Sequence, residues 1–268
     1  MKIMIVGNIF KDVYLDVDER SENFETDDRD VKWLNLSFDA SEHRYFHRLS
    51  NFGGAVISME VLNNMGIDAS ISGSKLKFDA DGVVTGGNTV ADLYRYILIS
   101  DDQVSYFVPS FEHKSTFVAP KEPVDYIYID RSANLSDPTE IISYLKKNPK
   151  TKLVTYIRKN VRGEAEEFLA SQSDIVFTER KTTCVKTDKV ITIHGNKVHY
   201  GDIDLELEIP RTDLTTHLTG YSIFAATVLG GMAAGFEDEK SFHLAKVNVE
   251  NSSLDATLSL NLMEELAA

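Results

Sequence analysis

Cysteine is nearly absent from this chain of 268 residues, and its scarcity excludes two kinds of site. Cys184 is the only one, so the sequence has neither an intramolecular disulfide framework nor a cysteine-based zinc site. The simplest interpretation of Cys184 is a small packed side chain rather than a nucleophile.

Long apolar runs and positive charge are also scarce. No stretch approaches the roughly 18 apolar residues that a membrane-spanning helix needs, and the run MKIMIVGN is too short for a signal peptide. The 28 Lys and Arg residues against 42 Asp and Glu give a formal net charge of −14. Nucleic acids and anionic membranes need clustered basic residues, so we expect neither partner and place the chain in the cytoplasm.

Apolar residues make up 43% of the chain, enough for a substantial core. Beyond residue 53, segments typical of strands alternate with segments typical of helices. This alternation predicts one three-layer α/β/α domain over residues 1–268 with a mostly parallel central sheet. Strands are expected at 2–7, 67–73, 124–130, 151–157, 173–178, 189–195 and 199–209, and helices at 53–66, 88–99, 137–148, 163–172 and from 216 onward.

Residues 13–50 interrupt this pattern. The segments 13–18 and 31–38 alternate apolar and polar side chains, as strands with one solvated face do, so a small antiparallel β excursion is expected here. Trp33 and Phe38 are apolar side chains that either complete a half-buried hairpin or pair with a second copy of the chain.

Several polar residues and glycines near the N-terminus are candidates for ligand binding. Asn8 and Asp12 follow the first strand, at the end where ligands of open α/β sheets bind, and Asp12 could instead cap its own turn. Gly53 and Gly54 precede a helix, where they allow either close approach of a ligand to the backbone or simply a tight turn.

A second group of candidates lies toward the C-terminus. Thr219 and Gly220 are expected to open a helix of small residues, whose first amides form a phosphate site. The alternative is a buried helix whose alanines and glycines, among them Gly230 and Gly231, let neighbouring elements pack closely. Thr178 and Glu179 end a predicted strand, either as the edge of a nucleotide or magnesium site or as a turn.

The order of these features resembles the PfkB/ribokinase family of sugar and nucleoside kinases. GN-x3-D, the Gly-Gly pair, VDYIYIDRSANL, SDIVFTE, KVITIHG and the small-residue helix follow one another as the family's segments do. The resemblance implies a ribokinase-like core with a small β lid, and ATP with Mg²⁺ as cofactors. It implies that Asn8, Asp12, Gly53 and Gly54 bind a sugar or nucleoside. The implied phosphate and nucleotide residues are Thr219, Gly220, Tyr221, Thr178, Glu179, Thr192 and Gly195.

The sequence departs from the family at its G-A-G-D-x-F-x-A-G signature. One alignment places Ser222 where the family has its catalytic Asp, and another places Ile223 there, so the carboxylate is absent either way. A serine cannot act as a base at pH 7 without a partner, and His217 is a weak alternative. The Asn of the family's GG-x3-N motif is Ser58 here.

Three functional hypotheses follow. The first is ATP-dependent phosphorylation of a sugar or nucleoside hydroxyl, impaired by the missing Asp. The second is a degenerate relative that binds a sugar, nucleoside or nucleotide as a sensor or regulator. The third is an α/β protein of unrelated function whose kinase resemblance stops at the fold.

Overall fold

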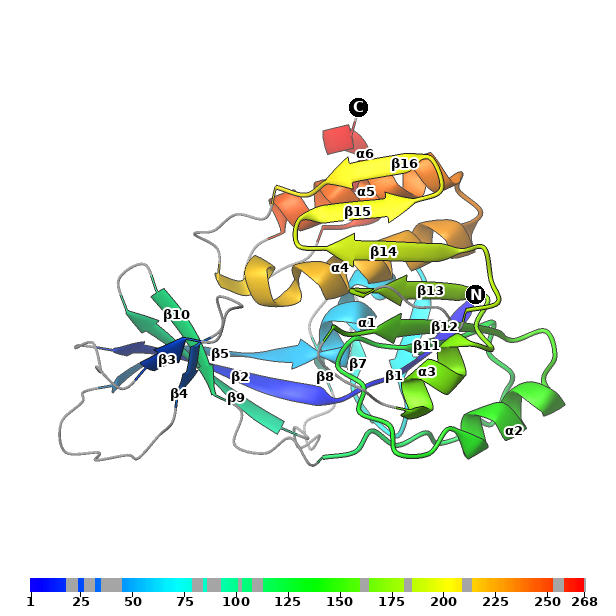
Figure 1. Ribbon diagram of the computed structural model, residues 1–268, viewed down its shortest axis with the longest axis horizontal. Helices are drawn as coiled ribbons and strands as arrows, with labels where there is room; N and C mark the ends of the chain where they lie inside the picture. Colours follow the sequence, from blue (N-terminus) through cyan, green and yellow to red (C-terminus); the bar gives the residue numbers. More distant parts are fainter. Residues whose placement is uncertain are drawn as a thin grey trace. The chain divides into compact units, whose positions relative to one another are not determined.

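Residues 1–17, 24–26, 32–34, 45–78, 84–85, 93–100, 103–107, 113–159, 164–180, 185–208, 214–252 and 258–267 are described by the computed structural model (Figure 1). These residues divide into two compact units. The core unit comprises Met1–Asn8, Gly54–Thr89 and Lys114–Ala268, and the second unit comprises Ile9–Gly53 and Val90–His113. Both are discontinuous in sequence.

The core unit is built on the predicted parallel sheet. Its strand order is β16-β15-β14-β13-β12-β11-β1-β6, parallel from β6 to β14 and antiparallel from β14 to β16. The strands are β1 (Lys2–Val6), β6 (Asp68–Ile71), β11 (Tyr126–Ile129), β12 (Lys152–Ile157), β13 (Ile175–Thr178), β14 (Val190–His194), β15 (Lys197–Tyr200) and β16 (Ile203–Glu206). This arrangement confirms the mostly parallel α/β fold expected from the sequence.

Helices cover both faces of this sheet (Figure 1). On one face Met4 and Val6 pack in a buried cluster with residues of α2 (Thr139–Lys147) and α3 (Glu164–Ala170). Ile3 and Ile5 alternate with them and are buried on the other face, where α1 (Ala55–Asn64) contacts β1 and β6. The remaining helices are α4 (Leu214–Ala234), which packs against α1 and α5, α5 (Asp238–Asn251) and α6 (Leu260–Ala267). None of the helices in the described part of the chain is long and apolar enough to cross a bilayer.

The second unit contains a six-stranded sheet of order β3-β4-β10-β9-β2-β5. Its strands are β2 (Ile9–Val17), β3 (Phe24–Thr26), β4 (Lys32–Leu34), β5 (Tyr45–Gly54), β9 (Leu93–Ser100) and β10 (Gln103–Phe107). The pair β3–β4, inside the predicted excursion, is antiparallel as expected. The pair β9–β10 is also antiparallel, whereas β2–β9 and β4–β10 are parallel, so the sheet is mixed. Trp33 lies in β4, and Phe38 lies outside the described residues. A short pair, β7 (Lys77–Phe78) with β8 (Val84–Thr85), belongs to the core unit.

Two expectations about these elements are wrong. The segment 88–99 was expected to be a helix, but residues 93–100 form strand β9. Its sequence LYRYILIS is rich in aromatic and β-branched residues, and pairing with strands on both edges outweighs the helical signal. The segment 199–209 is two strands rather than one, because Gly201 turns the chain with φ +56°.

Candidate functional site

The candidate site lies at the carboxyl edge of the core sheet, the edge at which its parallel strands end. The register places Val6 beside Ile129 and Ile157 beside Thr178, so the residues after β1, β11, β12 and β13 meet there. Ligands of open α/β sheets bind at this edge. The polar side chains that follow these strands are Asn8, Asp130, Arg131, Arg158 and Glu179.

Asn8 follows β1 and is hydrogen-bonded to the start of α1. Its side chain is 2% exposed, and its Oδ1 accepts a hydrogen bond of 2.8 Å from Ser115 Oγ. Its backbone oxygen accepts one of 3.0 Å from the amide of Ala55, next to Gly54. Gly54 precedes α1 with φ +66°, a conformation that favours glycine. Asn8 is therefore held next to the start of α1 and Gly54, and a role for these two residues in substrate binding stays a prediction.

Asp130, which follows β11, is a buried carboxylate that the sequence reasoning missed. It accepts hydrogen bonds from Ser58 Oγ at 2.5 Å, from the Ser132 amide at 2.7 Å and from Ser132 Oγ at 2.5 Å. Ser58, which replaces the family's Asn, is thus a partner of Asp130. A strand of four apolar residues ending directly in Asp was the available signal.

Asp12 and Gly53 belong to the second unit. Asp12 is a buried residue of β2 and lies beside Arg95 of β9 in the sheet register. Gly53 is a buried residue of β5. Both residues therefore lie in the six-stranded sheet, and a role for them in substrate binding stays a prediction.

Glu179 and Arg131 form a salt bridge of 2.6 Å at the carboxyl edge. The side chains are 11% and 29% exposed. Glu179 also accepts hydrogen bonds from Tyr156 Oη at 3.0 Å and from the Lys159 amide at 3.3 Å. Burial alone would raise the pKa of Glu179, but the charge of Arg131 and these hydrogen bonds hold it below its usual value.

Tyr221 joins this cluster from α4. The guanidinium carbon of Arg131 lies 5.3 Å from the centre of the Tyr221 ring, and Tyr221 Oη donates a hydrogen bond of 2.7 Å to the backbone oxygen of Gly195. Burial, followed by the charge of Glu179, raises the pKa of Tyr221. Two residues of the predicted nucleotide site, Glu179 and Tyr221, thus both contact Arg131, which the sequence reasoning missed. A third, Gly195, is joined to them through Tyr221.

The other predicted nucleotide residues lie on neighbouring strands. Thr178 and Thr192 are partners in the register of β13 and β14. The hydroxyl of Thr178 is engaged in its own turn, because it donates to the Arg180 oxygen at 2.7 Å and accepts from the Arg180 amide at 3.2 Å.

A second arginine, Arg158, follows β12. It donates a hydrogen bond of 2.7 Å to the Ala133 backbone oxygen. Burial, and after it the charge of Arg131, lowers the pKa of Arg158. Two guanidinium groups therefore lie close enough to influence each other at this edge, alongside the carboxylates of Asp130 and Glu179.

Helix α4 begins earlier than the sequence analysis expected. It starts at Leu214, five residues before Thr219, so Gly220, Tyr221 and Ser222 lie inside the helix. Only the first four amides of a helix lack internal partners, so the expected opening of the helix at Thr219 is wrong. A phosphate role for Thr219, Gly220 and Tyr221 stays a prediction. Leu214 and Leu218 extend the helical spacing upstream, and no glycine or proline interrupts it. Ser222 is 6% exposed. The side chains of residues 214–219, including His217 and Thr219, are outside the described set.

The described residues do not fit a magnesium ion at Glu179. Both carboxylate oxygens of Glu179 already accept hydrogen bonds from Arg131, Tyr156 or Lys159. Within the described ranges, no group of three or more His, Cys, Asp or Glu side chains could hold a metal.

Comparison with known proteins identifies the fold. No protein-family model and no curated protein matches the sequence. Solved structures do match. The nucleoside kinase of Methanocaldococcus jannaschii, an archaeal member of the ribokinase family, aligns with TM-score 0.62 and 13% identity over 99% of this chain and 97% of its own. Arabidopsis thaliana ribokinase, complexed with ribose and ATP, aligns with TM-score 0.63 and 12% identity over 99% and 98%.

A third match extends this likeness to a nucleoside complex. The Burkholderia thailandensis nucleoside kinase bound to inosine aligns with TM-score 0.55 and 14% identity over 94% of this chain and 92% of its own. These structures are sugar and nucleoside kinases of ribokinase type, and they cover nearly the whole chain. The fold is therefore ribokinase-like, as the order of the sequence motifs indicated.

Proposed function

We propose that this protein is an ATP-dependent kinase of PfkB type that phosphorylates a hydroxyl of a sugar or nucleoside, with transfer slowed by the missing general base. The observation that carries this proposal is the fold. It is shared over nearly the whole chain with kinases bound to ribose and ATP, to ADP and to inosine.

In this proposal the two ends of the site have different tasks. Asn8 and Gly54 bind hydroxyls of the acceptor, and the same role stays a prediction for Asp12 and Gly53 of the second unit. Arg131 and Arg158 supply positive charge for phosphate groups, because a guanidinium matches the geometry of phosphate oxygens. ATP is the proposed donor, and no step is assigned to Mg²⁺ because Glu179 does not fit it.

The missing base limits the rate without abolishing transfer. A positioned general base contributes about 10²–10⁴-fold, whereas positioning and charge stabilisation carry the rest of phosphoryl transfer. We therefore expect turnover reduced by about that factor relative to a kinase with the Asp.

A second candidate function is a degenerate protein that binds the same ligands as a sensor or regulator. Two observations favour it. The amides of Gly220 and Tyr221 are inside α4 rather than at its start. Both carboxylate oxygens of Glu179 already accept hydrogen bonds from protein donors. The first feature removes free amides that a phosphate group would use, and the second removes carboxylate oxygens that a phosphate-bound cation would use.

The deciding experiment combines binding with transfer. Thermal shift with ATP–Mg²⁺ and a panel of sugars and nucleosides identifies ligands, and transfer of labelled γ-phosphate to the stabilising acceptor tests catalysis. The kinase proposal expects stabilisation by both ligand types and slow transfer. Stabilisation by a sugar or nucleoside without any transfer would instead support the sensor, and no response to either would leave only the fold.

Variants sharpen this test. Asp12→Asn is expected to weaken acceptor binding, whereas Asp68→Asn, at an exposed position of β6, serves as its matched control. If transfer survives Ser222→Ala, Ser222 is not the base. The cytoplasmic location, the lid role of the second unit and a homodimer formed through it stay predictions.

A further inference from the structure

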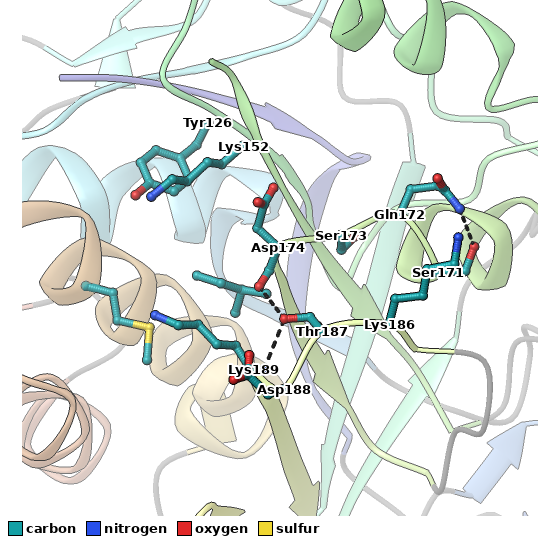
Figure 2. Close-up of a pocket in the computed structure, with 12 residues that line it drawn as sticks. Tyr126, Lys152, Ser171, Gln172, Ser173, Asp174, Lys186, Thr187, Asp188 and Lys189 are labelled. Atoms are coloured by element: carbon teal, nitrogen blue, oxygen red, sulfur yellow. Dashed lines mark hydrogen bonds between the residues drawn. The ribbon is translucent and has the colours of Figure 1, made fainter. Parts of the chain in front are cut away.

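A cavity of about 420 Å³ opens at the amino edge of the core sheet, the edge at which the parallel strands begin (Figure 2). It therefore lies at the opposite end of the strands from Arg131 and Glu179. Its volume falls within the range of sites for small molecules, about 300–1,000 Å³. It is lined by Tyr126, Lys152, Ser171, Gln172, Ser173, Asp174, Ile175, Lys186, Thr187, Asp188, Lys189 and Met232.

Three lysines line this cavity in a chain whose net charge is −14. Lys152 begins β12, and its Nζ lies 5.6 Å from the centre of the Tyr126 ring. Figure 2 shows Lys152 and Lys189 on one side of Asp174 and Lys186 on the other. Elsewhere Lys240 and Lys246 pair with glutamates, but among the described residues no carboxylate forms a salt bridge with any of the three cavity lysines.

The segment that carries two of these lysines is fixed by hydrogen bonds. Thr187 Oγ1 donates to the Asp174 backbone oxygen at 2.8 Å and accepts from the Lys189 amide at 3.1 Å, as the dashed lines in Figure 2 show. Lys186 and Lys189, on either side of Thr187 in sequence, are thereby tied to the start of β13. The cavity is thus lined by a positioned segment.

The two carboxylates of the cavity do not cancel its positive charge. Asp174 Oδ2 accepts a hydrogen bond of 2.8 Å from the Leu153 amide, so it is engaged in joining β12 to β13. Asp188 is exposed. Three lysines against two aspartates leave a net charge of +1 in the cavity.

We propose that this cavity binds a small phosphate-bearing molecule. Lysine ammonium groups act as point charges with three donors each, which suits a phosphate, whereas planar carboxylates are better matched by the arginine fork. The hydroxyl protons of Ser171 and Thr187 are already donated to the backbone oxygens of Phe168 and Asp174, so the lysines are the donors for the phosphate. The apolar Ile175 and Met232 give room for an organic ester. The site is separate from the proposed kinase site, because the two occupy opposite ends of the same strands.

Isothermal titration calorimetry with inorganic phosphate and pyrophosphate at low ionic strength tests the proposal. Both probes should bind the wild-type protein, pyrophosphate more tightly because it carries more charge. The triple variant Lys152→Gln, Lys186→Gln, Lys189→Gln should lose at least about tenfold in affinity, the effect of removing one charge-assisted hydrogen bond. Circular dichroism confirms that the variant is folded.

A control variant separates the cavity from the general charge of the protein. Lys75→Gln, Lys197→Gln, Lys240→Gln removes the same number of charges at exposed positions outside the cavity and should keep wild-type affinity. Equal loss in the two triple variants, or no heat with the wild-type protein, would overturn the proposal. Because the kinase assay reports on the other edge, failure of one proposal leaves the other open to its own test.

Discussion

The ion pair of Arg131 and Glu179 shows how one missed residue organises the candidate site. Glu179 was predicted as the edge of a nucleotide or magnesium site. The guanidinium of Arg131 fills the place at Glu179 that a cation would take, and it also lies over Tyr221. The local chemistry at this position is therefore set by a protein cation.

We expect Arg131→Gln to destabilise the protein by about 2 kcal/mol at neutral pH, between the values for an exposed pair and a fully buried one. The reason is that Glu179 would stay partly buried without its partner. Urea unfolding measures the difference. Lys240→Gln, which breaks an exposed pair with Glu264, is the control and should cost under about 1 kcal/mol.

The same pair predicts a pH dependence. The folded pKa of Glu179 is held below its ordinary value, so this contribution to stability is present above the ordinary carboxyl pKa of about 4.3 and is lost as the pH falls through the folded pKa. The stability gap between wild type and Arg131→Gln should therefore be smaller at about pH 4 than at about pH 7. A gap that stays constant would show that the pair does not act through the charge of Glu179.

Gly7 is a second position where a single added carbon atom would disturb the packing. A Cβ added there would lie 2.6 Å from Ser132 Oγ and 3.0 Å from Asp130 Cβ. Gly7→Ala should therefore destabilise by about 1–3 kcal/mol, as overpacked cores do. Thermal denaturation checks this, and the double variant with Ser132→Ala should recover part of the loss because it removes the clashing hydroxyl.

At the scale of elements, α4 contains two adjacent glycines with different surroundings. A Cβ on Gly231 would meet Ser241 of α5, including its backbone Cα at 3.2 Å, whereas one on Gly230 would meet the flexible end of Met65. Close packing of small residues, the alternative reading of this helix, is therefore present in the structure.

These two glycines should respond differently to alanine. Gly231→Ala should destabilise by about 1–3 kcal/mol, because α5 would have to move. Gly230→Ala should change stability by less than about 1 kcal/mol, because Met65 can shift and alanine favours the helix. Urea unfolding of both variants makes the comparison, and equal losses would contradict it.

The sequence predicted the elements that have one dominant signal. Strand β11 is a continuous apolar run, YIYI, and five of the six residues of β12 are buried. Helix α2 begins after Asp137, whose Oδ1 accepts a hydrogen bond of 2.9 Å from the Thr139 amide. The strand β9 and the start of α4 were missed. In β9 the pairing with β2 and β10 decides the conformation, and such distant partners are not visible in a local pattern.

The site was predictable where it follows strand ends, and not beyond. Asn8 and Glu179 come after buried strands, so their placement at the carboxyl edge could be anticipated. The link from Tyr221 to Arg131 and Gly195 joins α4 to β11 and to the turn after β14. These contacts depend on how helices pack on the sheet, which spacing along the chain does not specify.

For the molecule as a whole, the net charge of −14 predicts a response to salt. Like charges repel in the compact state, and salt screens them. Raising sodium chloride from about 0.02 M to about 0.5 M should therefore increase the Tm by about a few degrees. Differential scanning calorimetry measures this. A Tm that falls with salt would mean that favourable ion pairs dominate.

The place of β1 in the sheet has a consequence for how the protein is made. β1 lies between β6 and β11, and its first amide bonds Asp125, 123 positions further along the chain. A ribosome therefore produces this apolar strand early and its second partner much later. Until residue 129 has emerged, one edge of β1 has no native strand to pair with. Nascent chains that stop before that point expose the unpaired backbone N–H and C=O groups along this edge of β1. Chaperone binding or aggregation during synthesis would begin at these groups.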